Sequence, residues 1–324
     1  MPIALLKFPS DLLREVFKLC EPFELYKLSK CSKRAQRSKK LGGPKNWKIR
    51  FSSRRHVIIC VDDSNYSFEQ TKNPNEYFKI EYSRMCIEFP NGEAVDMFVY
   101  LLETFGIRTV ESLGCDYGNF HDFSKIARFL IGRNMEIESF WIGAMKYDAF
   151  MPLMNQMNIT KDFTSFFKFP SDFRLQLTKY PNKICIYYSF WYNIGQLLEC
   201  TCVRIELLGS KMRNRDLNVF LKKWKKRGTF PNLRLLKVDG NNIDDRSPIL
   251  GSKPPIKNVD NPTIRVSFGN EEIDDAIRVM KADGTVGWLN VKLGDVPTLK
   301  FLVANPTDTV VKDLAEDEDL EDDW

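Results

Sequence analysis

The sequence has few of the residues on which most enzyme active sites depend. Among 324 residues there are only two histidines, His56 and His121, and they lie far apart in the chain. No glycine-rich phosphate loop, no G-x-S-x-G sequence and no H-E-x-x-H sequence is present. The adjacent pair His121 and Asp122 is more typical of a polar loop than of a catalytic dyad. We therefore expect a protein that is not an enzyme, with no catalytic residues and no cofactor.

Long apolar runs and dense cysteine clusters are also absent. No stretch approaches the roughly 20 apolar residues of a membrane helix, and Ile3–Leu6 is too short for the apolar region of a signal peptide. We expect a cytoplasmic or nuclear protein that contacts no membrane. The eight cysteines are scattered and lie mostly inside apolar runs, which predicts buried, reduced thiols and no metal site.

Charge is distributed unevenly along the chain. Residues 27–55 contain twelve lysines and arginines and no acid, whereas residues 313–323 contain eight acids and no base. The basic segment lies beside Trp47 and Phe51, a combination found in nucleic-acid-binding proteins, but the same residues also suit the solvated face of a short amphipathic helix. We favour the solvated face. The acidic end has almost no apolar content, which predicts a disordered tail.

Apolar residues recur at helical spacing near the N-terminus. Ser10, after Pro9, is placed to cap a first helix that runs to about Cys20. Pro22 suits the opening turn of a second helix, and a third helix is expected at 32–41, before Gly42, Gly43 and Pro44. Isolated helices need roughly 12 to 15 residues to be stable, so these must bury apolar surface against one another or against a partner.

This stretch resembles the F-box. Phe8–Pro9 stands where the motif has Leu-Pro, Leu12–Leu13 at its paired aliphatics, Val16–Phe17 at its Ile-Phe, and Leu25 at the start of its second helix. The chain departs from the motif at Arg34–Arg37, where a tryptophan is usual. The resemblance implies docking on the Skp-type adaptor of a cullin ubiquitin ligase. The adaptor-binding residues that it implies are Phe8, Pro9, Leu12, Leu13, Val16, Phe17, Leu25 and Leu28.

Beyond the F-box, residues 46–90 are expected to form connecting strands. Alternating and apolar patterns predict strands at 56–61, 77–82 and 85–89, with a polar loop at 62–74. A helix with Val95, Phe98, Val99, Leu101 and Leu102 on its buried side is predicted after Asn91 and Gly92.

From there, short strand cores alternate with amphipathic helices. Strand cores are predicted at 110–113, 137–142, 203–208 and 233–238, and helices at 123–130, 148–157 and 216–224. The first and last pairs of cores are about 27 and 30 residues apart, near the upper end of leucine-rich repeat lengths. Such units stack into a parallel sheet with helices outside. Between them, Phe173–Leu177 and Ile184–Tyr188 compete as the next strand.

A second resemblance covers the C-terminal half. Asn214–Trp224 followed by Pro231–Val238 resembles the signature of the type 2 F-box-associated domain found beside F-boxes in a large nematode family. Asp216 is placed to cap a helix whose buried face carries Leu217, Phe220, Leu221 and Trp224. Ala276–Lys292 is similar to that family's terminal element, and Asp283 with Gly284 predicts a hairpin turn.

These patterns lead to one prediction of architecture. We expect an α/β protein, with a small N-terminal three-helix F-box followed by an irregular, leucine-rich-repeat-like parallel β/α solenoid that has extra antiparallel strands at its ends. The expected divisions are an F-box at 1–45, connecting strands at 46–90, an F-box-associated, repeat-like substrate-recognition domain at 91–305 and an acidic disordered tail at 306–324.

The resemblances imply a substrate-recognition subunit of a Skp/cullin/F-box E3 ubiquitin ligase. The F-box would bind the adaptor, and through it a cullin, while the C-terminal domain would hold a protein target whose identity the sequence does not reveal. The strand face of the repeats and the loops near Trp224 and Trp288 are the expected places for that target. The alternative is a non-catalytic binding module that contacts nucleic acid or an acidic protein through residues 27–55, with nucleic acid the less expected partner.

Overall fold

The computed structural model describes residues 8–31, 46–51, 56–89, 92–116, 120–143, 147–259, 264–305, 307 and 309–313. It is a mixed α/β structure whose chain divides into two compact units, residues 1–161 and 162–324. This boundary falls inside the single domain expected at 91–305. No helix in these described ranges is long and apolar enough to cross a membrane.

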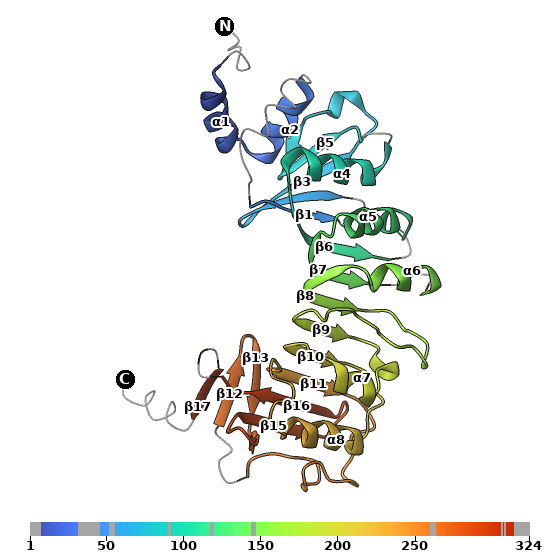
Figure 1. The fold of residues 1–324 in the computed structure, drawn as a ribbon, viewed down its shortest axis with the longest axis vertical. Helices are drawn as coiled ribbons and strands as arrows, with labels where there is room; N and C mark the ends of the chain where they lie inside the picture. The colour runs from blue at the N-terminus through green and yellow to red at the C-terminus, as the bar shows by residue number, and fades with distance from the viewer. Residues whose placement is uncertain are drawn as a thin grey trace. The chain divides into compact units, whose positions relative to one another are not determined.

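The first unit combines a mixed sheet with five α-helices among its described residues (Figure 1). Its strands follow the order β7-β6-β1-β2-β3-β5-β4, in which β6 pairs in parallel with both β7 and β1, and β1 pairs antiparallel with β2. The helices are α1 (Ser10–Leu19), α2 (Pro22–Cys31), α4 (Ala94–Phe105), α5 (Phe120–Gly132) and α6 (Tyr147–Met154). The strands are β1 (Lys48–Phe51), β2 (Val57–Val61), β3 (Ser64–Gln70), β4 (Ile80–Glu81), β5 (Arg84–Ile87), β6 (Thr109–Cys115) and β7 (Glu136–Ile142).

Aromatic side chains join α4, α5 and α6 to one face of this sheet. Phe140 of β7 stacks on Phe123 of α5 at 5.7 Å and on Phe150 of α6 at 5.9 Å between ring centroids. Phe51 of β1 meets Phe98 of α4 edge to face at 5.9 Å. All five rings are buried, so this layer is the core of the first unit.

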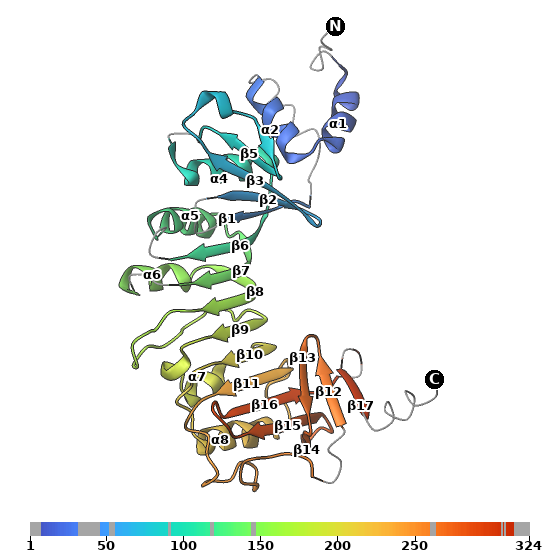
Figure 2. The same ribbon diagram turned by 180° about the vertical axis from the view of Figure 1, so that it is seen from behind.

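The second unit is built on a sheet of order β14-β15-β16-β11-β10-β9-β8, in which β8 to β11 are parallel and β16, β15 and β14 are antiparallel (Figure 2). A smaller sheet of order β13-β12-β17 accompanies it. The main strands are β8 (Asn158–Ser165), which contains the boundary between the units, β9 (Lys183–Ile186), β10 (Arg204–Leu207), β11 (Leu235–Asp239), β14 (Ile277–Met280), β15 (Val286–Lys292) and β16 (Thr298–Val303). The small sheet is β12 (Ile264–Phe268), β13 (Glu271–Asp274) and β17 (Thr309–Asp313), and the helices are α7 (Ile194–Glu199) and α8 (Asn214–Trp224).

The two faces of this main sheet are covered differently. On one face, α8 places Trp224 edge to face against Phe301 of β16, with ring centroids 4.7 Å apart. Gly287 of β15 lies beneath both rings, because a Cβ there would come within 3.0 Å of Trp224. On the other face, Leu235 and Leu302 form a buried cluster with residues of the small sheet, namely Val266, Ile273 and the adjoining Ala276.

Most strong sequence patterns correspond to elements of the structure. The helices at 95–102, 123–130 and 216–224 are confirmed as parts of α4, α5 and α8. The strand cores at 110–113 and 137–142 lie within β6 and β7, the core at 203–208 contains β10, and the core at 233–238 overlaps β11. The buried face of α8 is as predicted, with all four residues fully buried. The hairpin at Asp283 and Gly284 is also confirmed, because β14 and β15 pair antiparallel around it.

Other expectations were wrong. The loop predicted at 62–74 contains β3, because Asp62 adopts a positive φ of 48° and turns the chain directly back into a hairpin with β2. Of the strand predicted at 77–82, only β4 is extended, and a 3-10 helix, η3 (Pro74–Glu76), precedes it. Two segments competed as the strand after 137–142. Ile184–Tyr188 overlaps the strand β9, whereas Phe173–Leu177 is not part of a sheet.

The predicted helix caps differ in detail. Pro9, not Ser10, is the N-cap of α1, and its carbonyl accepts the Leu13 N–H at 3.0 Å. Asp216 lies inside the first turn of α8, where its carboxylate accepts the backbone N–H of the N-cap residue Arg213 at 3.0 Å. The carboxylate therefore stabilises the helix start from the third helical position.

Some expectations fall outside what the structure describes. The third F-box helix at 32–41 lies there, as do residues 314–324 of the acidic tail, whereas Thr309–Asp313 forms β17 and was wrongly assigned to that tail. The comparison of the parallel βα units with leucine-rich repeats stays an interpretation.

We expect Trp224→Ala to lower the free energy of unfolding by about 3 to 5 kcal/mol, because it removes a fully buried aromatic ring and leaves a cavity over Gly287 and Phe301. Denaturant unfolding followed by far-UV circular dichroism measures the change. Lys222→Ala, at an exposed position of the same helix, is the matched control and should change stability by less than about 0.5 kcal/mol. Equal stability of the two variants would contradict the packing described for α8.

Candidate functional site

We call the consecutive helices α1 and α2 the N-terminal hairpin, and its second helix, α2, is attached to the first unit by aromatic packing. Phe23 meets Tyr66 and Phe68 of β3 edge to face, at 5.1 and 5.2 Å between ring centroids. Tyr26 contacts Phe68 at 5.3 Å and Tyr100 of α4 at 6.0 Å. Because Phe23 and Tyr26 are buried in these contacts, α2 belongs to the core of the unit rather than standing apart from it.

Polar contacts reinforce the same junction. The hydroxyls of Ser29 and Tyr100 are hydrogen-bonded at 2.8 Å, and the ammonium of Lys30 lies 4.3 Å from the centre of the Tyr100 ring. Burial, together with the neighbouring Tyr100 hydroxyl, raises the pKa of Tyr26, and burial lowers the pKa of Lys30. A helix too short to be stable alone is thus held by both apolar and polar contacts to α4 and β3.

The eight residues assigned to adaptor binding do not share one environment. Leu13, Phe17 and Leu25 are buried within the chain, where they support the hairpin. The others retain accessible surface, with Pro9 and Leu12 exposed and Phe8, Val16 and Leu28 half-buried. Contact of any of the eight with an adaptor stays a prediction.

The sequence interpretation missed that α1 has two apolar faces. Leu12, Val16 and Leu19 follow one another at spacings of four and three residues, which places them on one side of the helix. Leu12 is 48% exposed and Leu19 is 85% exposed, whereas the neighbouring face with Leu13 and Phe17 is buried. We call Leu12, Val16 and Leu19 the exposed apolar stripe of α1.

Two of the four described basic residues of the segment 27–55, Lys48 and Arg50, are paired with carboxylates of the first unit. The Lys48 ammonium lies 2.9 Å from a carboxylate oxygen of Glu138, and Arg50 lies 3.1 Å from Glu111. The hydrogen bond to Glu138 raises the pKa of Lys48, so the pair remains ionised at neutral pH. These two cations are therefore engaged by carboxylates, and the basic residues within 32–45 and 52–55 lie outside the described residues.

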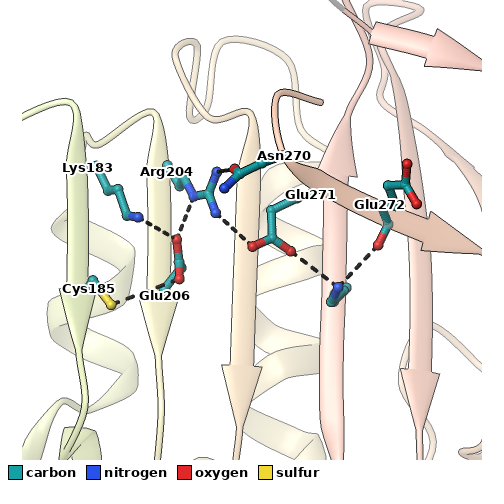
Figure 3. A network of polar contacts seen from close by, with 8 residues as sticks. Lys183, Cys185, Arg204, Glu206, Asn270, Glu271 and Glu272 are labelled. Atoms are coloured by element: carbon teal, nitrogen blue, oxygen red, sulfur yellow. Dashed lines mark hydrogen bonds and ion pairs between the residues drawn. The ribbon is translucent and has the colours of Figure 1, made fainter. Parts of the chain in front are cut away.

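An ion-pair network lies on the side of the main sheet that carries the small sheet, on the strand face where a target was expected (Figure 3). Glu206 of β10 accepts from Lys183 of β9 at 3.0 Å and from Arg204 of its own strand. Arg204 also reaches Glu271 of β13 at 2.8 Å, and Glu271 in turn pairs with Lys300 of β16 at 3.2 Å. The network thereby joins the small sheet to the main sheet.

Strand alternation explains why these charges meet. Side chains alternate along β10. Ile205 and Leu207 face the helices, so Arg204 and Glu206 face the other side of the sheet. Burial alone would raise the pKa of Glu206, but the ammonium of Lys183 and the guanidinium of Arg204 outweigh burial and lower the pKa. Each of these charged groups has a partner of opposite sign, and the network ties the small sheet to the main sheet.

The remaining sequence candidates are cysteines and tryptophans, most of which are buried; the expectation of buried thiols is wrong for Cys31, which is exposed. All eight cysteines are free, and burial and the Glu206 carboxylate raise the pKa of Cys185 to about 11, so its thiol stays protonated at neutral pH. Trp224 is fully buried and Trp288 is partly buried against the Leu235 cluster. The small sheet covers part of the strand face, and the expectation that a target binds on that face or at the loops near Trp224 and Trp288 stays a prediction.

The described N-terminal helices are α1, with its exposed apolar stripe, and α2, which is packed on the first unit. The family model described as F-box domain matches residues 5–40, and the family model described as F-box associated matches residues 172–238. No curated protein and no solved structure matched the chain. The chain is an F-box protein with an F-box associated domain.

Both families are adaptor or binding modules, and an F-box generally binds a Skp-type adaptor and, through it, a cullin. The F-box match contains α1 and α2. The F-box associated match runs from before β9 into β11 and so contains the network residues Lys183, Arg204 and Glu206.

We expect Glu206→Gln to lower the free energy of unfolding by about 2 kcal/mol at neutral pH, because Lys183 and Arg204 lose a charged hydrogen-bond acceptor. Folding lowers the pKa of Glu206 from 4.5. The stabilisation that its carboxylate gives is therefore present in full above pH 4.5 and is lost as the pH falls through the lowered pKa. The difference between variant and wild type should shrink as the pH falls below 4.5. Denaturant unfolding over a pH series measures it, with the exposed Glu199→Gln as control; a difference that is independent of pH would contradict this role.

Proposed function

We propose that this chain is the substrate-recognition subunit of a Skp/cullin/F-box E3 ubiquitin ligase. The observation that carries the proposal is the exposed apolar stripe of α1, within the F-box match, on a hairpin whose other apolar face is already buried in the chain. An exposed leucine at 85% accessibility, beside two further apolar residues, is typical of a surface completed by a partner.

The adaptor would bind this stripe together with the accessible surface of Phe8, Pro9 and Leu28. Leu13, Phe17 and Leu25 would act beneath it by keeping the hairpin rigid. A stable complex of this type buries roughly 1,600 Å² in total, so further residues of the F-box beyond the stripe must also contribute.

The mechanism is tethering. The aromatic contacts of α2 with β3 and α4 hold α2 in one orientation on the first unit, so an adaptor bound to the F-box would be joined to this unit through α2. The second unit, with the F-box associated domain, would bind the target. Tethering raises the effective concentration of the target near the ubiquitin-charged enzyme, and no residue of this chain takes part in the chemistry. This function would operate in the cytoplasm or the nucleus.

The alternative of nucleic-acid binding through residues 27–55 gains no support from the described residues. Lys48 and Arg50, the two basic residues of the segment placed in β1, are paired with Glu138 and Glu111. A phosphate would have to displace those carboxylates before it could bind there.

We expect the double variant Leu12→Asp with Val16→Asp to lose capture of a purified Skp-type adaptor, because two carboxylates on the exposed apolar stripe cannot be desolvated in an apolar interface. Copurification or biolayer interferometry measures adaptor binding. The C-terminal unit should stay folded, as judged by an unchanged main unfolding transition, because both substituted positions keep accessible surface in the chain.

Arg14→Asp is the matched control. It introduces a carboxylate on the opposite side of the same helix from Leu12 and should leave adaptor binding within about threefold of wild type. If the double variant captured the adaptor as well as wild type does, the tethering proposal would be wrong.

A further inference from the structure

Three large aromatic side chains lie exposed at the carboxyl ends of two neighbouring parallel strands in the second unit. Phe166 directly follows β8, and Tyr187 and Tyr188 directly follow β9. Their exposed fractions are 45%, 42% and 41%. Phe166 and Tyr187 stack on each other with ring centroids 4.5 Å apart and planes inclined by 28°, so together they form a continuous apolar platform.

Two lysines lie over aromatic rings of this region, Lys168 over the exposed Tyr188 and Lys211 over the nearby Phe190. The Lys168 ammonium lies 4.6 Å from the centre of the Tyr188 ring, and the Lys211 ammonium, in the loop after β10, lies 5.4 Å from that of Phe190. Neither lysine has an ion-pair partner among the described residues of the chain. This sets them apart from Lys183, which is matched by a carboxylate on the strand face.

The loops that carry these side chains are held firmly. The Tyr187 N–H donates to the Ser165 carbonyl at 2.9 Å, and the Phe167 N–H donates to the Ser165 hydroxyl at 3.2 Å. Ser189 donates both its N–H and its hydroxyl to the Leu208 carbonyl, each at 2.9 Å. Loops fixed in this way present their rings without a large loss of conformational entropy on binding.

A buried aromatic cluster packs beneath the surface of these loops. Phe169 stacks on Phe173 at 4.1 Å, and both contact the buried Trp191 edge to face, at 5.1 and 4.6 Å. The fold therefore has room for aromatic side chains in its core, yet it leaves Phe166, Tyr187 and Tyr188 at the surface. Aromatic residues at the surface are characteristic of interface hot spots, and the carboxyl ends of parallel strands are where α/β sheets bind ligands.

We propose that Phe166, Lys168, Tyr187 and Tyr188 form a docking surface for an extended acidic segment of the protein target, with Lys211 as a neighbouring positive charge. An apolar side chain of that segment packs on the stacked rings of Phe166 and Tyr187, and its carboxylates pair with Lys168 and Lys211. The proposal deepens the proposed function, on which it rests only for identifying the bound segment as part of a target.

The test uses the full-length chain and a fluorescein-labelled peptide in which glutamates alternate with glycines around a central tryptophan. Binding is measured by fluorescence anisotropy over a salt series. We expect wild type to bind this peptide with an affinity that falls as salt rises, and to bind more weakly a peptide with lysine at each glutamate or glycine at the tryptophan. Lys168→Glu and Tyr187→Ala should each weaken binding at least about tenfold.

Two matched controls guard against general effects. Lys222→Glu makes the same charge change at an exposed position of α8, and Val219→Ala trims a side chain that is 50% exposed on that helix. Both should bind like wild type. The surface assignment would be overturned if the acidic peptide failed to bind, if acidic and basic peptides bound equally, or if Lys168→Glu and Tyr187→Ala bound like the controls. Because no adaptor is present, failure here is distinguishable from failure of the F-box to bind an adaptor.

Discussion

The burial of Phe23 and Tyr26 against Phe68 is the interaction on which the N-terminal part of this structure depends. Two helices of ten residues each are too short to be stable alone, so their apolar faces must be covered by something. The first unit covers the apolar face of α2 with β3 and α4, and the pairing of β2 with β3 brings Tyr66 and Phe68 within reach of Phe23. The exposed stripe of α1 is the apolar surface that remains after this packing.

The same constraint, that each apolar face must be covered, shapes the second unit. Its main sheet is covered on one face by helices, with Trp224 over Phe301, and on the other by the small sheet around Leu235. Arg204 of the main sheet forms ion pairs with Glu206 of its own strand and with Glu271 of the small sheet, and these pairs connect the two sheets. With both faces occupied, the carboxyl edge of the parallel strands is where aromatic side chains remain exposed. A binding surface at that edge is compatible with a fully packed sheet.

Sequence periodicity identified elements whose residues are buried on one side and solvated on the other. The helix with Leu217, Phe220, Leu221 and Trp224 is an example, since its pattern has a single period and no competing interpretation. Periodicity was less successful at 62–74, where the polar residues of β3 resembled a loop. Only Phe68 of that strand is fully buried, so the strand is stabilised by its pairing with β2 and β5 rather than by its own composition.

The F-box and F-box associated matches, the absence of catalytic motifs and the order of the main helices and strands were determined by the sequence alone, because they depend on local spacing and residue type. The tertiary structure decided which apolar residues remain accessible. Leu13 and Leu12 are adjacent in sequence and equally apolar, but one is 4% and the other 48% exposed because only one faces the body of the unit. The tertiary structure also decided which lysines have an ion-pair partner. The sequence alone does not distinguish Lys183 from Lys168, but the parallel pairing of β9 with β10 brings Glu206 beside Lys183.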